Sequence, residues 1–98
     1  MRLDLPWYIS TLVLMKTIER VQTGVRLERK TVKVLKALAE YLDLSMGDLL
    51  ERIVLHAFDG RSAFEPITLQ QVARLKEVYG LDLTSADIDR LTETIRQP

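Results

Sequence analysis

The sequence predicts a mainly α-helical fold in which one β-strand comes before the helices. Three observations support this prediction: residue types alternate strictly over residues 20–28, apolar residues recur every three or four positions from about Lys30 onward, and capping residues and glycines separate four helical segments. Strict alternation is typical of a half-buried strand, and the wider spacing is typical of an amphipathic helix. The 98 residues, of which 47% are apolar and 29% charged, suit one folded domain with or without an appendage.

The predicted strand is the segment RVQTGVRLE. Its two faces would carry Val21, Thr23, Val25 and Leu27 on one side, and Gln22, Gly24, Arg26 and Glu28 on the other. No second strand follows at hairpin spacing, although the backbone donors and acceptors of a strand need a partner. We therefore expect this strand to pair with its own copy in another subunit.

Two helices follow the predicted strand. The first begins near Lys30 and ends at Asp43, with an apolar stripe made of Leu35, Leu38, Ala39 and Leu42. The second begins after Ser45, which is an N-cap with Asp48 as the acid three residues later, and ends at Gly60. A short helix–turn–helix unit should therefore follow the strand.

Residues 61–98 form a predicted C-terminal helical hairpin. The segment RSAFEP reads as a linker, after which Thr68 is the expected N-cap of a third helix that Gly80 ends. Thr84 and Asp87 open a last helix by the same capping chemistry.

Residues 1–15 form an apolar leader. Its apolar run from Trp7 to Met15 is too short to cross a bilayer, which takes about twenty residues. Asp4 and the lack of a small-residue cleavage site disfavour a signal peptide. Two interpretations remain: translation begins at Met15, which we slightly favour, or the leader adds a strand or short helix to the domain.

The net charge of zero, from 14 basic and 14 acidic residues, hides a strong asymmetry along the chain. Residues 16–36 hold seven basic and two acidic residues, a net charge of +5, whereas residues 37–98 hold six basic and eleven acidic residues, a net charge of −5. Such segregation indicates either a surface for a polyanion beside an acidic body or a lysine-rich solvated helix face. The absence of cysteine excludes disulfides and thiolate metal sites.

The segment VRLERKTVKVLKALAEYLDLSMGDLLERIVLHAF resembles the Arc/MetJ-type pattern of the ribbon-helix-helix DNA-binding family. The matching features are Arg26-Leu27 at the strand end, the run Leu35-x-x-Leu38-Ala39-Glu40 in the first helix, and Ser45 at the start of the second. The resemblance covers about residues 20–59. It departs from the family at Asp43, where relatives usually have glycine, and at Gly47, where they often have a hydroxyl or amide side chain.

The resemblance implies a fold of one strand and two helices, in an intertwined dimer whose two strands form an antiparallel ribbon in the major groove of double-stranded DNA. The chain would then divide into the leader (1–15), a DNA-binding and dimerisation domain (16–60) and the C-terminal hairpin (61–98).

The resemblance also assigns roles to individual residues. The base-contacting positions would be Gln22, Gly24 and Arg26. Arg26 suits guanine and Gln22 suits adenine, whereas Gly24 has no side chain to contribute, so we expect modest specificity or reliance on arrayed dimers. The phosphate contacts would be Lys16, Arg20, Arg29, Lys30 and Lys33, with the backbone N–H groups of Met46 and Gly47. The dimer core would contain Val21, Val25, Leu27, Leu35, Leu38, Leu42, Leu49, Leu50, Ile53 and Phe58.

Two functions follow as expectations. The first is a cytoplasmic, nucleoid-associated transcriptional regulator, such as a repressor, that binds DNA as a homodimer or a higher-order array. The second is a protein-interaction module, such as an antitoxin or scaffold, whose acidic C-terminal helices bind a partner protein. The chain lacks a serine–histidine–acid set, a phosphate-binding glycine loop and metal-ligand spacing, and His56 is its single histidine. We therefore expect no enzyme activity, no cofactor, no bound metal and no membrane attachment.

Overall fold

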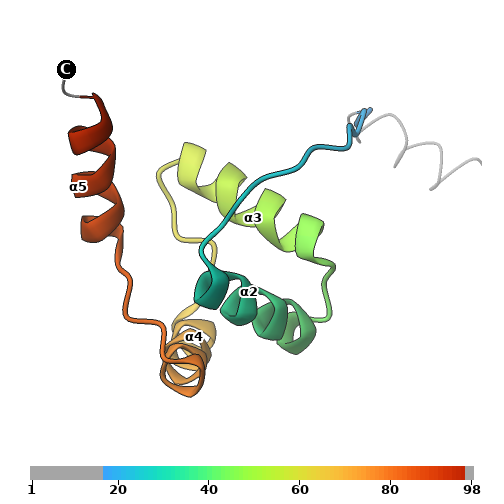
Figure 1. The fold of residues 1–98 in the computed structure, drawn as a ribbon. Helices are drawn as coiled ribbons and strands as arrows, with labels where there is room; N and C mark the ends of the chain where they lie inside the picture. The colour runs from blue at the N-terminus through green and yellow to red at the C-terminus, as the bar shows by residue number, and fades with distance from the viewer. Residues whose placement is uncertain (1–16, 97–98) are drawn as a thin grey trace, which may run out of the picture.

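The computed structural model describes residues 17–96, and the side chains of residues 17–91 (Figure 1). Within that range the chain forms an extended segment, residues 17–28, followed by helices. The helices are α2 (Arg29–Leu42), α3 (Met46–Phe58), α4 (Pro66–Tyr79) and α5 (Ser85–Arg96). None of these described helices is long and apolar enough to cross a membrane.

The predicted strand over residues 20–28 is wrong, and with it the ribbon-helix-helix fold, because residues 17–96 contain no β-strand. The segment is extended and exposed, and no backbone hydrogen bond joins residues 17–27 to another described residue. Alternation of polarity describes side chains only, whereas a strand also needs a second backbone beside it. The described part of the chain is all-α.

Helix α2 begins and ends on two acidic residues. The Glu28 carboxylate is the N-cap and accepts the backbone N–H groups of Lys30 at 2.9 Å and Thr31 at 2.8 Å. At the other end Asp43 is left-handed, with φ 58°, and the Leu44 N–H donates to the Ala39 carbonyl oxygen at 2.9 Å. A left-handed residue at a helix end is usually glycine, and Asp43 takes that conformation here at the position where the ribbon-helix-helix family usually has glycine.

Helix α3 has the predicted N-cap, because the Ser45 hydroxyl accepts the Asp48 N–H at 3.1 Å. Gly60 follows its last turn with a φ of 72°. The predicted limits of this helix are confirmed.

Helix α4 begins earlier than predicted. Its N-cap is Glu65 and its first residue is Pro66, so Thr68 lies inside the first turn and is not a cap. Proline suits the first helical position, since the N–H it lacks would have no acceptor there. Gly80 ends the helix with a φ of 66°, as predicted.

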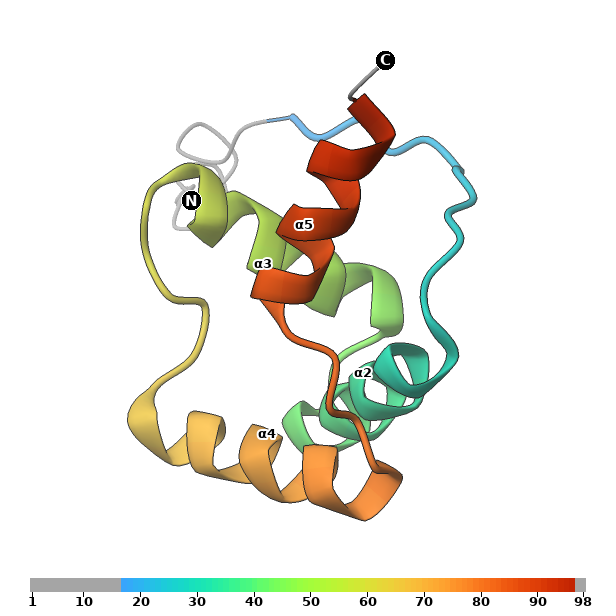
Figure 2. The same cartoon turned by 60° about the vertical axis from the view of Figure 1, so that its left-hand side comes forward.

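Helix α5 starts after Thr84, as predicted. The Asp87 carboxylate accepts the backbone N–H of Thr84 at 2.9 Å, and Arg90 pairs with the same carboxylate. In the described residues the backbone of α5 makes no close contact with the other helices. It stands apart from them in Figure 1, whereas in the turned view of Figure 2 its ribbon is drawn across that of α3.

The core is small and lies on α2. Leu38 and Ala39 of α2 and Leu49 of α3 are its buried members. The half-buried side chains around them come from α2, α3, α4 and two connecting loops, namely Leu35, Leu42, Leu44, Ile53, Phe64, Val72 and Leu75. Because α2 packs on both α3 and α4, these three helices form one unit.

Candidate nucleic-acid interface

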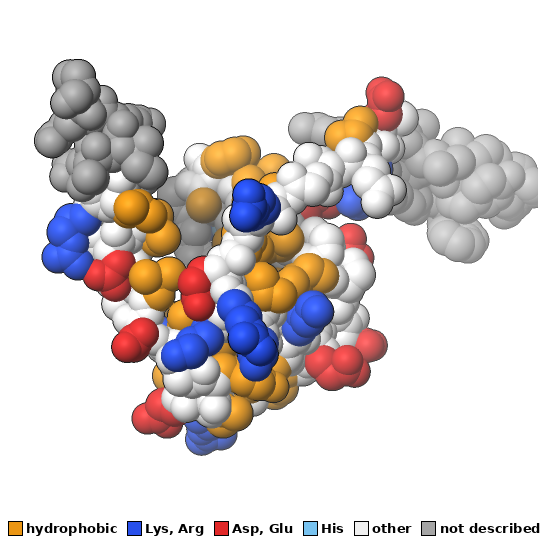
Figure 3. Space-filling view, viewed as in Figure 1, with side chains coloured by type: hydrophobic (Ala, Val, Ile, Leu, Met, Phe, Trp, Pro, Cys, Tyr) orange, Lys and Arg blue, Asp and Glu red, His pale blue; other side chains and the backbone are white. Residues whose placement is uncertain are grey.

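Exposed basic side chains lie along the extended segment and α2. Arg29, Lys33 and Lys36 are exposed and lie at intervals of four and three residues, which places them on one side of the helix. Arg26 is exposed just before the helix begins. In the space-filling view, blue side chains gather over the start of α2 (Figure 3).

The three predicted base-contacting positions, Gln22, Gly24 and Arg26, all lie in the extended segment and are exposed. A Cβ placed on Gly24 would meet nothing within 4 Å. The side chains of Gln22 and Arg26 are therefore accessible, but no strand ladder fixes their orientation in the described structure.

Arg20, a predicted phosphate contact, is already paired within the chain. Its Nη1 lies 2.7 Å from Glu51 Oε1 and 4.0 Å from Asp48 Oδ1. The hydrogen bond to Glu51 and the charge of that residue raise the pKa of the Arg20 guanidinium above its ordinary value. This contact joins the extended segment to the first two turns of α3.

Lys30 has a different neighbour. A Cβ placed on Gly80 would lie 3.7 Å from Lys30 Nζ, so the ammonium group lies beside the C-terminal end of α4. A cation is favourable there because the last carbonyl groups of a helix carry partial negative charge. Lys30 thus contributes to the contact between α2 and α4.

The remaining predicted phosphate contacts are distributed as follows. Met46 and Gly47 form the first turn of α3, where backbone N–H groups have no acceptor in their own helix, and Gly47 is exposed. Asp48 lies in the same turn and brings a negative charge. Lys16 lies outside the described residues.

The predicted dimer-core residues fall into two groups. Within the chain's own core, Leu38 and Leu49 are buried, while Leu35, Leu42 and Ile53 pack against them and Leu50 is half-buried. The others are exposed, by 77% at Val21, 67% at Val25, 44% at Leu27 and 79% at Phe58.

Phe58 belongs to an apolar outer face of α3. Val54 and Leu55 on the same helix are 43% and 56% exposed. We call Val54, Leu55 and Phe58 the α3 outer face. Since the opposite side of α3 packs on α2 through Leu49 and Ile53, this helix is apolar on two sides.

Sequence reasoning missed two features of this region. The first is the pairing of Arg20 with Glu51, because nothing in sequence spacing connects residues 31 positions apart. The second is Glu28 as the cap of α2, for which a signal existed, since an acid precedes Thr31 by three residues at the helix start.

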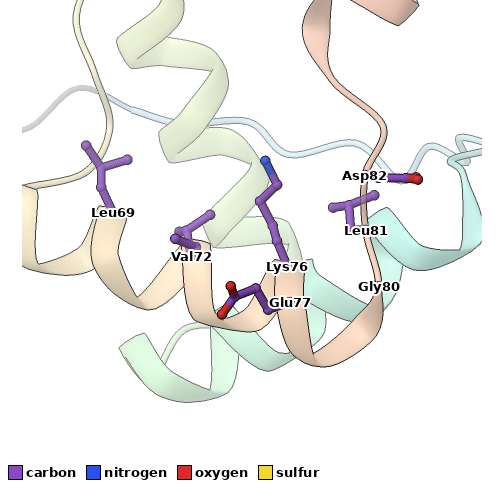
Figure 4. Close-up of a pocket in the computed structure, with 8 residues that line it drawn as sticks. Leu69, Val72, Lys76, Glu77, Gly80, Leu81 and Asp82 are labelled. Atoms are coloured by element: carbon purple, nitrogen blue, oxygen red, sulfur yellow. The ribbon is translucent and has the colours of Figure 1, made fainter.

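His56, clusters of metal-ligand residues and a groove along α4 are the remaining features of the described residues that bear on site chemistry. His56 Nδ1 donates to the Arg52 carbonyl oxygen of its own helix at 2.8 Å, which is a structural role. No group of three or more potential metal ligands occurs among the described residues. An open groove runs along α4, with the apolar side chains Leu69, Val72 and Leu81 in its lining (Figure 4). The same lining includes the charged side chains Lys76, Glu77 and Asp82.

No family model matches the sequence, and no curated protein or solved structure is detectably similar to it.

Proposed function

We propose that this protein is a homodimeric, sequence-specific DNA-binding transcriptional regulator. The observation that carries the proposal is the set of exposed cations at the extended segment and along one side of α2: Arg26, Arg29, Lys33 and Lys36. Lysine and arginine side chains on one side of a helix suit the regular row of phosphates along a duplex.

Local electrostatics support a polyanion at this surface. Residues 16–36 carry a net charge of +5, and one of their two acids, Glu28, is engaged in capping α2. The compensating negative charge belongs to residues 37–98. A duplex held by the basic surface would be repelled by the acidic remainder, which favours a single docking face and weak non-specific attraction.

Base recognition in this proposal depends on Arg26 and Gln22. Arg26 can donate two hydrogen bonds to guanine, and Gln22 can pair with the edge of adenine. Both side chains are exposed, and both precede α2, whose cations would hold the adjacent phosphates.

The dimer in this proposal is supported by the α3 outer face. A helix that is apolar on two sides requires cover on both, and α2 covers only one. A second copy of the chain supplies an identical apolar surface, which is how two-fold interfaces are generally built.

Selection of binding sites from random duplex DNA at two salt concentrations tests this function. The proposal predicts an enriched motif, with half-sites related by two-fold symmetry, and weaker binding at the higher salt concentration. Recovery of unenriched sequence at both salt concentrations contradicts it.

A protein partner is a second candidate for residues 61–98. Two observations favour it: the backbone of α5 makes no close contact with the other described helices, and Leu91 on α5 is 56% exposed. Deleting residues 83–98 separates the two functions: DNA affinity should be retained, and only binding of a protein partner should be lost.

A further inference from the structure

Arg20 is the one predicted phosphate contact that the described structure places between two carboxylates. We propose that Glu51 and Asp48 act as an internal competitor for DNA phosphate at Arg20, so that the chain binds DNA less tightly than its basic segment alone would allow. This inference rests on the proposed function and concerns the regulation of the same surface.

The geometry makes the competition direct. The same atom, Arg20 Nη1, approaches both acids, at 2.7 Å from Glu51 Oε1 and 4.0 Å from Asp48 Oδ1. A phosphate oxygen that bound this N–H would have to take the place that the Glu51 carboxylate occupies. Nη1 carries two N–H groups, and one of them donates to Glu51. A phosphate therefore competes with the carboxylate for that N–H and for the orientation of the guanidinium that the ion pair holds.

The exposure of the three side chains makes exchange possible. They are 58% exposed at Arg20, 45% at Glu51 and 55% at Asp48, so water and a phosphate group can reach the pair. Ion pairs at such exposed sites are weak and are screened by salt. The dense phosphate charge of a duplex is thus able to displace the carboxylate.

The position of the acids adds to their effect. Asp48 lies in the first turn of α3, beside the free N–H groups of Met46 and Gly47 that would otherwise attract an anion. Glu51 lies one turn further along the same side of the helix. The acid pair therefore opposes phosphate both at Arg20 and at the helix end.

The test uses two variants that remove the same charge. Glu51→Gln removes the competitor, whereas Glu65→Gln removes an exposed carboxylate that makes no capping hydrogen bond at the start of α4. Fluorescence anisotropy with a labelled duplex should show tighter binding by Glu51→Gln than by Glu65→Gln, by roughly two- to fivefold for each Arg20 released. The salt dependence of log K should steepen by about 0.9 for each added phosphate contact.

A double variant identifies Arg20 as the cause. If the competition is correct, Arg20→Ala should abolish the gain that Glu51→Gln produces. A gain that persists in the Arg20→Ala background, or a Glu51→Gln affinity no higher than that of Glu65→Gln, overturns the inference. The absence of duplex binding by every protein, the wild type included, instead overturns the proposed function.

Discussion

Glu28 shows how one side chain fixes the junction between the extended segment and α2. Its carboxylate accepts the Lys30 and Thr31 N–H groups and the Thr31 hydroxyl, all within 2.9 Å. These bonds, with the backbone N–H of Lys30 as the largest contribution, lower the pKa of Glu28 below its ordinary value. The cap thus stabilises the fold only while the carboxylate is ionised.

A pH-dependent contribution to stability follows from this cap. Because the pKa is lower in the folded chain, the stabilisation is fully present above the unfolded pKa of about 4.3 and is lost as the pH falls through the folded pKa. Urea unfolding should show Glu28→Gln to be less stable than wild type near neutral pH, with the difference shrinking in acid. Glu65→Gln, at an N-cap without a side-chain hydrogen bond, is the control and should show little difference at either pH.

The residues also show what a sequence can reveal about a site. Alternation did not separate exposed from buried positions in the extended segment, because Val21 and Val25 are exposed there as well as Gln22 and Arg26. The pairing of Arg20 with Glu51 could not be predicted either, because it depends on how a segment crosses a helix far away in the sequence. Tertiary structure decides which side chains are exposed and which of them are already engaged.

At the scale of elements, helices were predictable because their signals are local. Ser45, Gly60, Gly80 and Thr84 mark helix ends in the sequence and in the structure alike. The strand prediction was wrong because its hydrogen bonds depend on a second backbone, which periodicity does not reveal. The sequence pattern places the start of α4 too late, because it assigns Pro66 to the linker, whereas Pro66 is the first residue of the helix.

The turn between α2 and α3 gives a prediction at this scale. Asp43 holds a left-handed conformation that glycine adopts without a steric cost. Asp43→Gly should therefore stabilise the fold by relieving the steric strain of the left-handed backbone. The gain should be about 1 kcal/mol or less, because the greater conformational freedom of glycine in the unfolded chain partly offsets it. Thermal unfolding followed by circular dichroism measures the change, and a lower melting temperature for Asp43→Gly would disprove the assignment of strain to this turn.

At the scale of the whole molecule, the described chain buries few apolar side chains and leaves many large apolar side chains exposed. Only Val34, Leu38, Ala39 and Leu49 are buried apolar residues within it, whereas the α3 outer face remains open. Helix α4 completes the core on one side of α2. The sequence did not indicate this role, because the apolar stripe of α4 does not reveal which helix it packs against.

The proposed dimer predicts a difference between two exposed apolar residues. Phe58 on the α3 outer face is 79% exposed, and Val78 on α4 is 71% exposed. Phe58→Asp should shift the protein from dimer to monomer in sedimentation velocity without loss of helix content, because a charge at a two-fold interface meets its own copy. Val78→Asp should leave the dimer intact. Equal behaviour of the two variants would contradict dimerisation through α3.

The DNA-binding surface itself is tested most directly by one pair of arginine variants. Arg26 lies at the proposed base-contacting segment, and Arg74 is an exposed arginine on α4. With the selected duplex, fluorescence anisotropy should show that Arg26→Ala loses about 1–3 kcal/mol of binding free energy and discriminates less between sites, while Arg74→Ala binds nearly as wild type. Dimerisation should persist in both variants, because neither arginine lies on the α3 outer face. Unchanged affinity in Arg26→Ala, or an equal loss in the two variants, would contradict a specific DNA interface at the start of α2.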